Sequence, residues 1–416
     1  DEQLYDDVLE YAAENNIEAN FNIDDWTGGQ TLSGSMGDEI GKTVNKYTFR
    51  VTSAKTNKVI VKSNTSIPIH IDWGDTQTEL STRPKYIVHN YTNNKEQNIK
   101  FTIADKYLDE FEDIGTANLI TCLFNITGYY VGNIKGFIYK FLSTTNGSFA
   151  IPIIVNDGVK TIGNYAFYNL RSSMFLRLPK TVNEINDWAF AYGSFTKGIE
   201  LPDNISHIGQ GAFSKCSIKN KNDFVLPSNL ETLGNDAFNK CGIKGNLVIP
   251  NRVKSIPDYC FANNNLSSVK ISDSVENIET KAFINNDRLK TLELGNNVKS
   301  IGRSAFYGVK LTGTLEIPSS VIIIHSFAFA SCELLNKLIF NEGIEHIGKY
   351  AFNSCANIET PLVLPESLKS VGKRAFQLCD RIKTLYVCED TKLAERIVND
   401  RTEVITYKKG NKPIIK

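Results

Sequence analysis

Ten phenylalanines recur at a nearly constant spacing in this chain, and the repeat limits the fold more than any other feature. Neighbouring members lie 22 to 25 residues apart, most often 23. Each copy reads apolar, two residues, apolar, three residues, small residue, Phe, as in Val159–Phe167. A fixed period in the low twenties indicates a solenoid of stacked coils. The repeated residues are Phe167, Phe190, Phe213, Phe238, Phe261, Phe283, Phe306, Phe329, Phe352 and Phe376.

A triplet of apolar, variable and apolar residues precedes each Phe-bearing segment, as in Leu247-Val-Ile249 and Leu315-Glu-Ile317. This alternation is expected of a short strand with one buried face. Pro follows the triplet directly in six units, where the strand no longer needs its amide for pairing. We therefore expect a coil core built from two strand residues, two aliphatic residues, the small residue and the Phe.

The consensus resembles a known repeat family. Ala212-Phe-Ser-Lys-Cys216 and Leu247-Val-Ile-Pro250 are similar to the Treponema-type leucine-rich repeats of BspA-like surface proteins. The resemblance covers about two-thirds of the chain. It implies a mostly β leucine-rich-repeat solenoid of about ten 23-residue units, and a non-enzymatic protein displayed on a cell surface for adhesion to a host, matrix or neighbouring-cell protein.

Ahead of the repeats, several short segments alternate with period two, among them Tyr47–Val51, Tyr86–Tyr91 and Ile99–Ile103. Such segments predict a small antiparallel sandwich. Trp73-Gly-Asp75, followed by His89-Asn-Tyr91, resembles the signature of polycystic-kidney-disease (PKD) type domains, which are immunoglobulin-like sandwiches. Thr76 stands where that signature has a second Gly.

These patterns predict five consecutive parts of the chain. The segment before the solenoid has two interpretations, a degenerate N-terminal cap of the repeats or, in its first part, the end of the sandwich. Beyond Phe376 we expect an eleventh strand at Thr384–Cys388, a short helix at Leu393–Val398 and a last strand at Val404–Tyr407. The parts are an N-terminal tether (1–41), a PKD-like β-sandwich (42–107), the cap (108–148), the solenoid (149–383) and a C-terminal cap (384–416).

Charge argues against two classes of partner. Lys plus Arg and Asp plus Glu are equal at 46 each, whereas binding to nucleic acid or an anionic membrane requires a basic excess. No apolar run approaches the roughly 18 residues needed to span a bilayer. The chain opens at Asp1 without Met or an apolar leader, so either it was trimmed for expression or a targeting segment has been removed. We expect a lipoprotein anchored at the cell surface through a removed N-terminal leader, which a lipid-accepting Cys at the end of that leader would confirm. Membrane association would occur only through that anchor.

The sequence predicts no cofactor, metal site or catalytic centre. Five of the eight Cys lie three residues after a repeat Phe, which favours small buried free thiols over disulfides. There is no Cys-x-x-Cys for zinc, and Asp72 and Asp75 are too few ligands for calcium. Glu342, Glu345 and His346 lie close in sequence, but the repeat places them around a turn, so we expect a solvated polar turn.

A surface is the better candidate site. The middle residue of each triplet should point outward, so that one row of side chains lines one face of the solenoid. We predict a protein-binding face, although β-branched residues in this row would also be explained by strand propensity alone. The alternative function is carbohydrate or matrix binding through the sandwich, with the repeats as a spacer. The predicted partner-binding residues are Val225, Val248, Glu293, Glu316, Ile339, Val363 and Tyr386.

Overall fold

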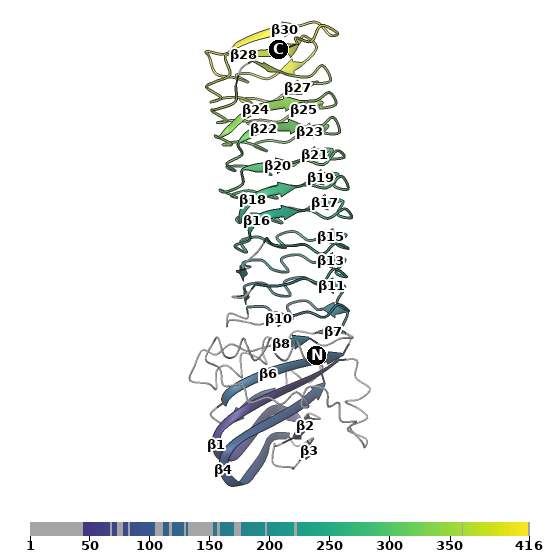
Figure 1. Ribbon diagram of the computed structural model, residues 1–416, viewed down its shortest axis with the longest axis vertical. Helices are drawn as coiled ribbons and strands as arrows, with labels where there is room; N and C mark the ends of the chain where they lie inside the picture. Colours follow the sequence, from purple (N-terminus) through teal and green to yellow (C-terminus); the bar gives the residue numbers. More distant parts are fainter. Residues whose placement is uncertain are drawn as a thin grey trace. The chain divides into compact units, whose positions relative to one another are not determined.

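The protein is described here from a computed structural model, in which parallel strands stack coil upon coil (Figure 1). The chain forms two units, Asp1–Pro202 with Ser217–Lys219, and Asp203–Cys216 with Asn220–Lys416, and each is described by itself. Side chains are described from Val155 onward, except at 176–177. The structure describes residues 45–66, 69–72, 78–81, 84–104, 111–115, 119–128, 130–131, 153–155, 159–169, 176–195, 198–219, 223–359 and 361–414.

The first unit is built on an eight-stranded sheet with strand order β10-β8-β6-β1-β4-β2-β3, in which β5 also pairs with β1. Strands β7, β9 and β11 form a separate parallel ladder, and β12 pairs with β14. The strands are β1 (Asn45–Ser66), β2 (Ile69–Asp72), β3 (Thr78–Ser81), β4 (Pro84–Ala104), β5 (Phe111–Gly115), β6 (Leu119–Gly128), β7 (Tyr130–Val131), β8 (Ile153–Val155), β9 (Thr161–Ile162), β10 (Leu176–Arg177), β11 (Glu184–Ile185), β12 (Ser194–Phe195) and β14 (Ser217–Ile218).

Strand β6 joins the antiparallel and parallel parts of this sheet. It pairs antiparallel with β1, Asn45 opposite Gly128, and parallel with β8, Phe124 opposite Ile153. The chain then enters β7, which pairs parallel with β9. Strand β6 is therefore shared between the antiparallel strands and the repeats. Together, β6 and β7 provide the strands that pair with β8 and β9 of the first repeat.

The PKD-like sandwich predicted for 42–107 is not supported. The strands that the structure describes in this range belong to one sheet, with β1 and β4 paired along most of their length across several bulges. Trp73, Gly74 and Asp75, which carry the first half of the resemblance, lie outside the described residues, as does the predicted tether 1–41, whereas His89 and Tyr91 lie in β4. The sandwich stays a prediction.

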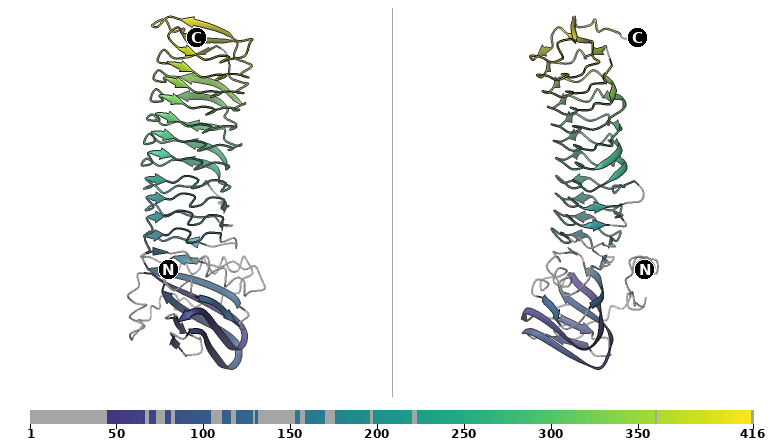
Figure 2. Two further views of the ribbon diagram at one scale, coloured as in Figure 1. Left: turned by 180° about the vertical axis from the view of Figure 1, so that it is seen from behind. Right: turned by 90° about the vertical axis from the view of Figure 1, so that its left-hand side faces the viewer.

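The second unit contains only strands and turns among its described residues, and all of its strand pairs are parallel. Two ladders can be followed along it in Figure 2. The first carries the triplets and is divided into the sheets β16-β18-β20, β22-β24 and β26-β28-β30, whereas the second is one sheet of two-residue strands, β17-β19-β21-β23-β25-β27-β29. The strands are β13 (His207–Ile208), β15 (Thr232–Leu233), β16 (Lys244–Val248), β17 (Ser255–Ile256), β18 (Asn265–Lys270), β19 (Asn277–Ile278), β20 (Thr291–Glu293), β21 (Ser300–Ile301), β22 (Gly313–Ile317), β23 (Ile323–Ile324), β24 (Leu335–Phe340), β25 (His346–Ile347), β26 (Leu362–Val363), β27 (Ser370–Val371), β28 (Thr384–Cys388), β29 (Lys392–Leu393) and β30 (Glu403–Tyr407).

The repeat phenylalanines form the core, as the spacing predicts. Phe261 is fully buried, and its ring lies 5.5 Å from both Phe238 and Phe283, nearly parallel to each. The same stacking continues from Phe283 through Phe376 at 5.2–5.4 Å between ring centroids. Most of the aliphatic positions and the small residue before each Phe are buried as well. The prediction of a mostly β solenoid with one Phe per coil is confirmed.

The Phe-bearing segment closes each coil through an unusual backbone conformation. Tyr259 and Asn263, two residues before and two after Phe261, have φ of 56° and 57°, in the left-handed region. The amides of Tyr259, Phe261 and Asn263 donate to carbonyls of the next coil at 2.8–3.0 Å. These bonds offset the strain of non-glycine residues in that region, because each satisfies a backbone group that faces the neighbouring coil.

The end of the array differs from its prediction. Leu393–Val398 is not a helix, because Lys392–Leu393 forms β29 in the second ladder and the following residues turn. Ile397 occupies the place of a repeat Phe: it is buried, and its carbonyl accepts from the Phe376 amide at 2.7 Å. The chain therefore completes an eleventh coil, in which an aliphatic side chain replaces the aromatic one.

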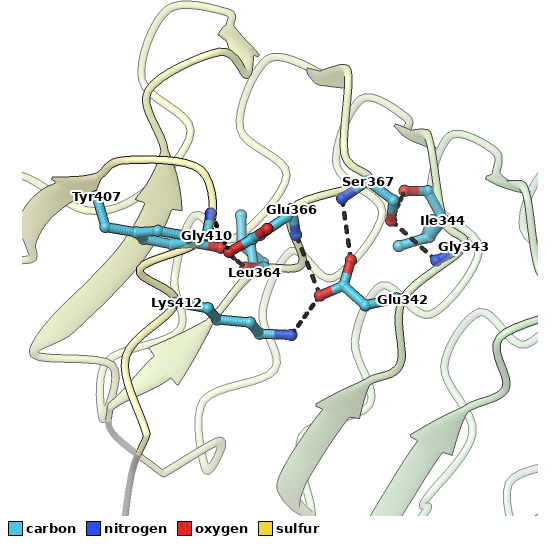
Figure 3. A network of polar contacts seen from close by, with 9 residues as sticks. All are labelled: Glu342, Gly343, Ile344, Leu364, Glu366, Ser367, Tyr407, Gly410 and Lys412. Carbon is cyan, nitrogen blue, oxygen red and sulfur yellow. Dashed lines mark hydrogen bonds and ion pairs between the residues drawn. The ribbon is translucent and has the colours of Figure 1, made fainter.

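The last residues fold back over earlier coils (Figure 3). The Tyr407 hydroxyl donates to the Leu364 carbonyl at 2.6 Å, and the Gly410 amide donates to Glu366 Oε1 at 2.9 Å. Lys412 Nζ lies 2.6 Å from Glu342 Oε1. Glu342 also accepts from the amides of Glu366 and Ser367. Polar contacts thus attach the final segment to two successive turns of the array.

We expect this attachment to weaken in acid. Burial raises the pKa of Glu342, but hydrogen bonds from Lys412, Ser367 and Glu366 outweigh it and leave the pKa lowered. The stabilisation is therefore present above the ordinary Glu pKa of about 4.3 and is lost as pH falls through the folded-state value. Because the pair is half-exposed, it contributes at most about 1 kcal/mol. Thermal melting between neutral and acidic pH should show a smaller acid-induced decrease for Glu342→Gln than for the unmodified chain; equal decreases would contradict this.

Candidate binding surfaces

The predicted row of outward residues lies along the triplets of the second unit. Val225 is 72% exposed and Val248 57% exposed, and both are flanked by buried triplet partners. Glu293 and Glu316 are exposed, whereas Ile339, Val363 and Tyr386 are half-buried. The alternation follows from the period of two in a strand. All seven residues lie on the side of the triplets that faces away from the core, and partner binding by them stays a prediction.

Charged residues in the middle of this row separate the apolar residues at its two ends. Val248 stands in register with Lys270, and Lys270 with Glu293, to which it forms an ion pair at 3.0 Å. Glu316 accepts from Asn341 Nδ2 at 2.8 Å. Beyond these residues, Glu316 pairs with Ile339 and Val363 pairs with Tyr386. The row therefore offers apolar side chains at its two ends and charged ones between them.

The predicted solvated polar turn is wrong for two of its three residues: Glu342 lies in a turn, but Glu345 is outside that turn and His346 begins β25, and both are only partly exposed. Glu345 accepts from Lys369 Nζ at 2.8 Å, and this hydrogen bond lowers the pKa of Glu345. His346 Nδ1 lies 2.8 Å from Ser370 Oγ, in the next coil. The Glu345 carboxylate is 4.0 Å from His346 Nε2, too far for a hydrogen bond, so the three residues do not form a Ser-His-Glu catalytic arrangement.

Sequence reasoning missed the role of one interior column. The residue three positions after the Phe is Cys, Asn or Val in most coils, which suggests only a small buried side chain. The Cys241 thiol donates to the Phe213 carbonyl at 2.8 Å, and Asn264 Nδ2 donates to the Phe238 carbonyl at 2.8 Å. Cys and Asn are thus equivalent here because each donates to the carbonyl of the preceding coil.

The buried thiols of this column are in their protonated, unreactive form. Burial raises the pKa of Cys241 and Cys355, so both stay protonated near neutral pH and retain the proton that they donate. No disulfide joins the seven cysteines from Cys216 onward. Within the described part of the chain, no group of three His, Cys, Asp or Glu is placed to hold a metal ion.

Exposed aromatic rings occur on the Phe-bearing side of the coils, outside the predicted sandwich. Tyr165 is 44% exposed, and its ring lies 5.5 Å from that of Tyr168. In the second unit, the rings of Phe327 and Tyr350 stack at 4.8 Å, and the Arg374 guanidinium lies 5.7 Å from the Tyr350 ring. These rings are relevant to glycan binding, which uses exposed aromatic faces.

No helix among the described residues has the length and apolarity to cross a membrane.

Comparison with known proteins gives one family match and several likenesses to solved structures. The family described as the BspA type leucine rich repeat region matches in six copies, over residues 146–258, 219–314 and 310–396. No curated protein matches. A leucine-rich repeat protein from Bacteroides ovatus is 19% identical, with 71% of this chain and 96% of that chain covered and a TM-score of 0.42.

Two further solved structures are similar to this chain at comparably low sequence identity. A leucine rich cell surface protein from Faecalibacterium prausnitzii is 23% identical, with 59% of this chain and 60% of that chain covered and a TM-score of 0.31. The pneumococcal vaccine antigen PcpA is 17% identical, with 68% of this chain and 86% of that chain covered and a TM-score of 0.34. At these values the likenesses carry no argument about function.

Proposed function

Because the chain belongs to the BspA-type leucine-rich-repeat family, which its repeats match over more than half of its length, we propose that it is a non-enzymatic binding protein of the cell surface. In this proposal the outward row of the triplets holds a protein partner from a host, a matrix or a neighbouring cell. Anchoring through a removed N-terminal leader is part of the same proposal. Partner binding by a broad strand face requires no cofactor and no catalytic group.

The observation that supports this proposal most directly is the exposure of valine in the row. Val225 and Val248 place branched apolar side chains in solvent at 72% and 57% exposure, on adjacent repeats. Solvent-exposed apolar groups that lie together on a rigid element are typical of protein contact sites. Coils that stack in a fixed register also hold these side chains in place, so that binding them costs little conformational entropy.

An adhesion assay tests the proposal. Beads coated with the full chain should attach to a monolayer of cultured epithelial cells, and Val225→Asp with Val248→Asp should reduce attachment by about tenfold, as expected when a contact centre receives unpaired charges. Asn251→Asp with Lys254→Asp is the matched control, because both residues are exposed, lie in the same region of the array and are absent from the row. An equal loss in both variants would contradict the proposal.

Enzymatic treatment of the monolayer separates the protein partner from the alternative. Trypsin should abolish attachment if the partner is a protein. Loss of attachment after glycosidase treatment alone would instead favour carbohydrate binding, for which the exposed Tyr165 and its neighbour Tyr168 are the described candidates. The alternative predicted from the sequence, carbohydrate or matrix binding through the sandwich with the repeats as a spacer, concerns residues whose side chains lie outside the described part.

A further inference from the structure

A groove of about 490 Å³ runs over the second ladder near the end of the array. It crosses strands β23, β25 and β27, which follow one another along the second unit in Figure 1, and β29, which pairs with β27. This ladder is distinct from the one that carries the valine row. The volume lies within the range of roughly 300–1,000 Å³ that is usual for ligand sites. Ile323 and Leu393 are among the apolar residues that line it, and Leu393 is 37% exposed.

Glycines keep the floor of the groove low. Gly348 and Gly372 follow the two-residue strands of successive coils, and Ala394 occupies the same position in the next coil. A Cβ on Gly348 would lie 2.6 Å from the Ser326 amide nitrogen, and one on Gly372 would lie 2.6 Å from that of Lys349. A side chain at either position would therefore require the backbone of the preceding coil to shift. The consequence is a floor of backbone, bordered by longer side chains.

The charged side chains that line the groove are both cations, and the remaining polar side chains can donate or accept hydrogen bonds. Lys349 and Lys392 are its charged residues, both exposed, and no Asp or Glu is among the described residues that line it. His325, His346, Ser326 and Ser370 supply further polar groups. Two carboxylates adjoin the lining residues in sequence: Glu345, which forms an ion pair with Lys369 at 2.8 Å, and the exposed Glu395, which follows Ala394. The groove is thus locally basic in a chain whose formal net charge is zero.

We propose that this groove binds an acidic, extended segment of a protein partner, as a second contact surface beyond the valine row. Lys349 and Lys392 stand two coils apart, a separation of roughly 10 Å along the stack. Alternate residues of an extended peptide face the same side and lie roughly 7 Å apart, and the flexible lysine side chains can span the remaining difference of about 3 Å to reach carboxylates at alternate positions. The intervening small side chains would cover Ile323 and Leu393. The two cations and the partly exposed apolar residues of the lining fit this kind of ligand.

Fluorescence anisotropy with a labelled Glu-Ala-Glu-Ala-Glu-Ala-Glu-Ala peptide tests the proposal on the full chain. Binding at about 50 mM salt should weaken as salt is raised, since the contacts are exposed ion pairs. Lys349→Gln with Lys392→Gln should weaken it about tenfold. Ala394→Trp should also weaken it, because the indole fills the groove without changing its charge. Thermal melting of each variant checks that the array is intact.

The control variant is Lys290→Gln with Lys337→Gln, which removes two exposed lysines of the same unit outside the groove. Its peptide affinity should change by less than about twofold, as expected for screened charges away from the contact. Equal loss in control and groove variants, or no binding of the peptide, would overturn the proposal. So would heparin binding that depends on Lys349 and Lys392 while the peptide does not bind, since the surface would then recognise a sulfated glycan. The valine-row variant should bind the peptide normally, so failure of one proposal leaves the other testable.

Discussion

Replacing Phe261 with alanine should lower the free energy of unfolding by about 3–5 kcal/mol. The side chain is fully buried in the middle of the array, and its ring is stacked between Phe238 and Phe283 at 5.5 Å on each side. Truncation removes both stacking contacts and leaves a cavity that cannot close, because the register of two ladders fixes the spacing of the coils. Thermal and urea unfolding followed by circular dichroism would measure the loss.

Lys270→Ala is the matched control for this substitution, since it changes the neighbouring repeat on the outside. The Lys270 side chain is 63% exposed and its ion pair with Glu293 at 3.0 Å lies in solvent. Such a pair contributes about 0–1 kcal/mol. If Phe261→Ala and Lys270→Ala unfolded at the same temperature, the assignment of Phe261 to the coil core would be wrong. Repeat arrays can unfold in parts, so the comparison uses the same probe for both variants.

Regular spacing made the solenoid predictable from the sequence. One Phe per 23 residues, preceded by a small residue, can be buried in every copy only if the copies stack in register. The exposure of Val225 and Val248 follows from the same pattern, because a triplet with two buried ends must turn its middle residue outward. Amino-acid composition alone would have predicted neither the solenoid nor the exposed valines.

Other parts of the coil carry no comparable signal. Tyr259 and Asn263 adopt positive φ although neither is glycine, and what stabilises them is a carbonyl in the next coil, about 20 residues away. The two-residue strands of the second ladder are too short for a period of two to be visible. The strand boundaries in the first unit could not be predicted either. Strand β1 spans 22 residues and continues, with bulges, through polar positions that the sequence pattern suggests are a turn.

The groove could not be predicted for a similar reason. Its lysines, Lys349 and Lys392, are 43 positions apart, and its floor depends on Gly348 and Gly372, whose role becomes clear only from the close approach of the preceding coil. Charge composition was misleading here, since equal numbers of acidic and basic residues in the whole chain concealed a local basic excess. The repeat predicts which side chains form a row within one column, but it does not show which residues of several columns together line a groove.

Asn264→Ala should cost about 3 kcal/mol or more, although the side chain is small and lies in a column where cysteine and valine also occur. Asn264 is only 3% exposed. Its Oδ1 accepts from the amides of Cys241 and Ile243 at 3.1 and 3.0 Å. Its Nδ2 donates to the carbonyls of Phe238, Phe261 and Ala262 at 2.8–3.1 Å. Alanine would leave these backbone groups buried without partners, and each such group costs about 1–3 kcal/mol.

Two other positions of the column give a graded test. Asn286 makes fewer contacts, donating to the carbonyls of Phe261 and Phe283 and accepting from Leu266 at 3.3 Å, so Asn286→Ala should cost less than Asn264→Ala. The Cys241 thiol makes one close contact, to Phe213 at 2.8 Å, and Cys241→Ala should cost about 1 kcal/mol. Urea unfolding of the three variants should reproduce the order Asn264, Asn286, Cys241. Because volume changes are similar, an equal cost at all three positions would show that packing, and not hydrogen bonding to the preceding coil, determines what this column requires.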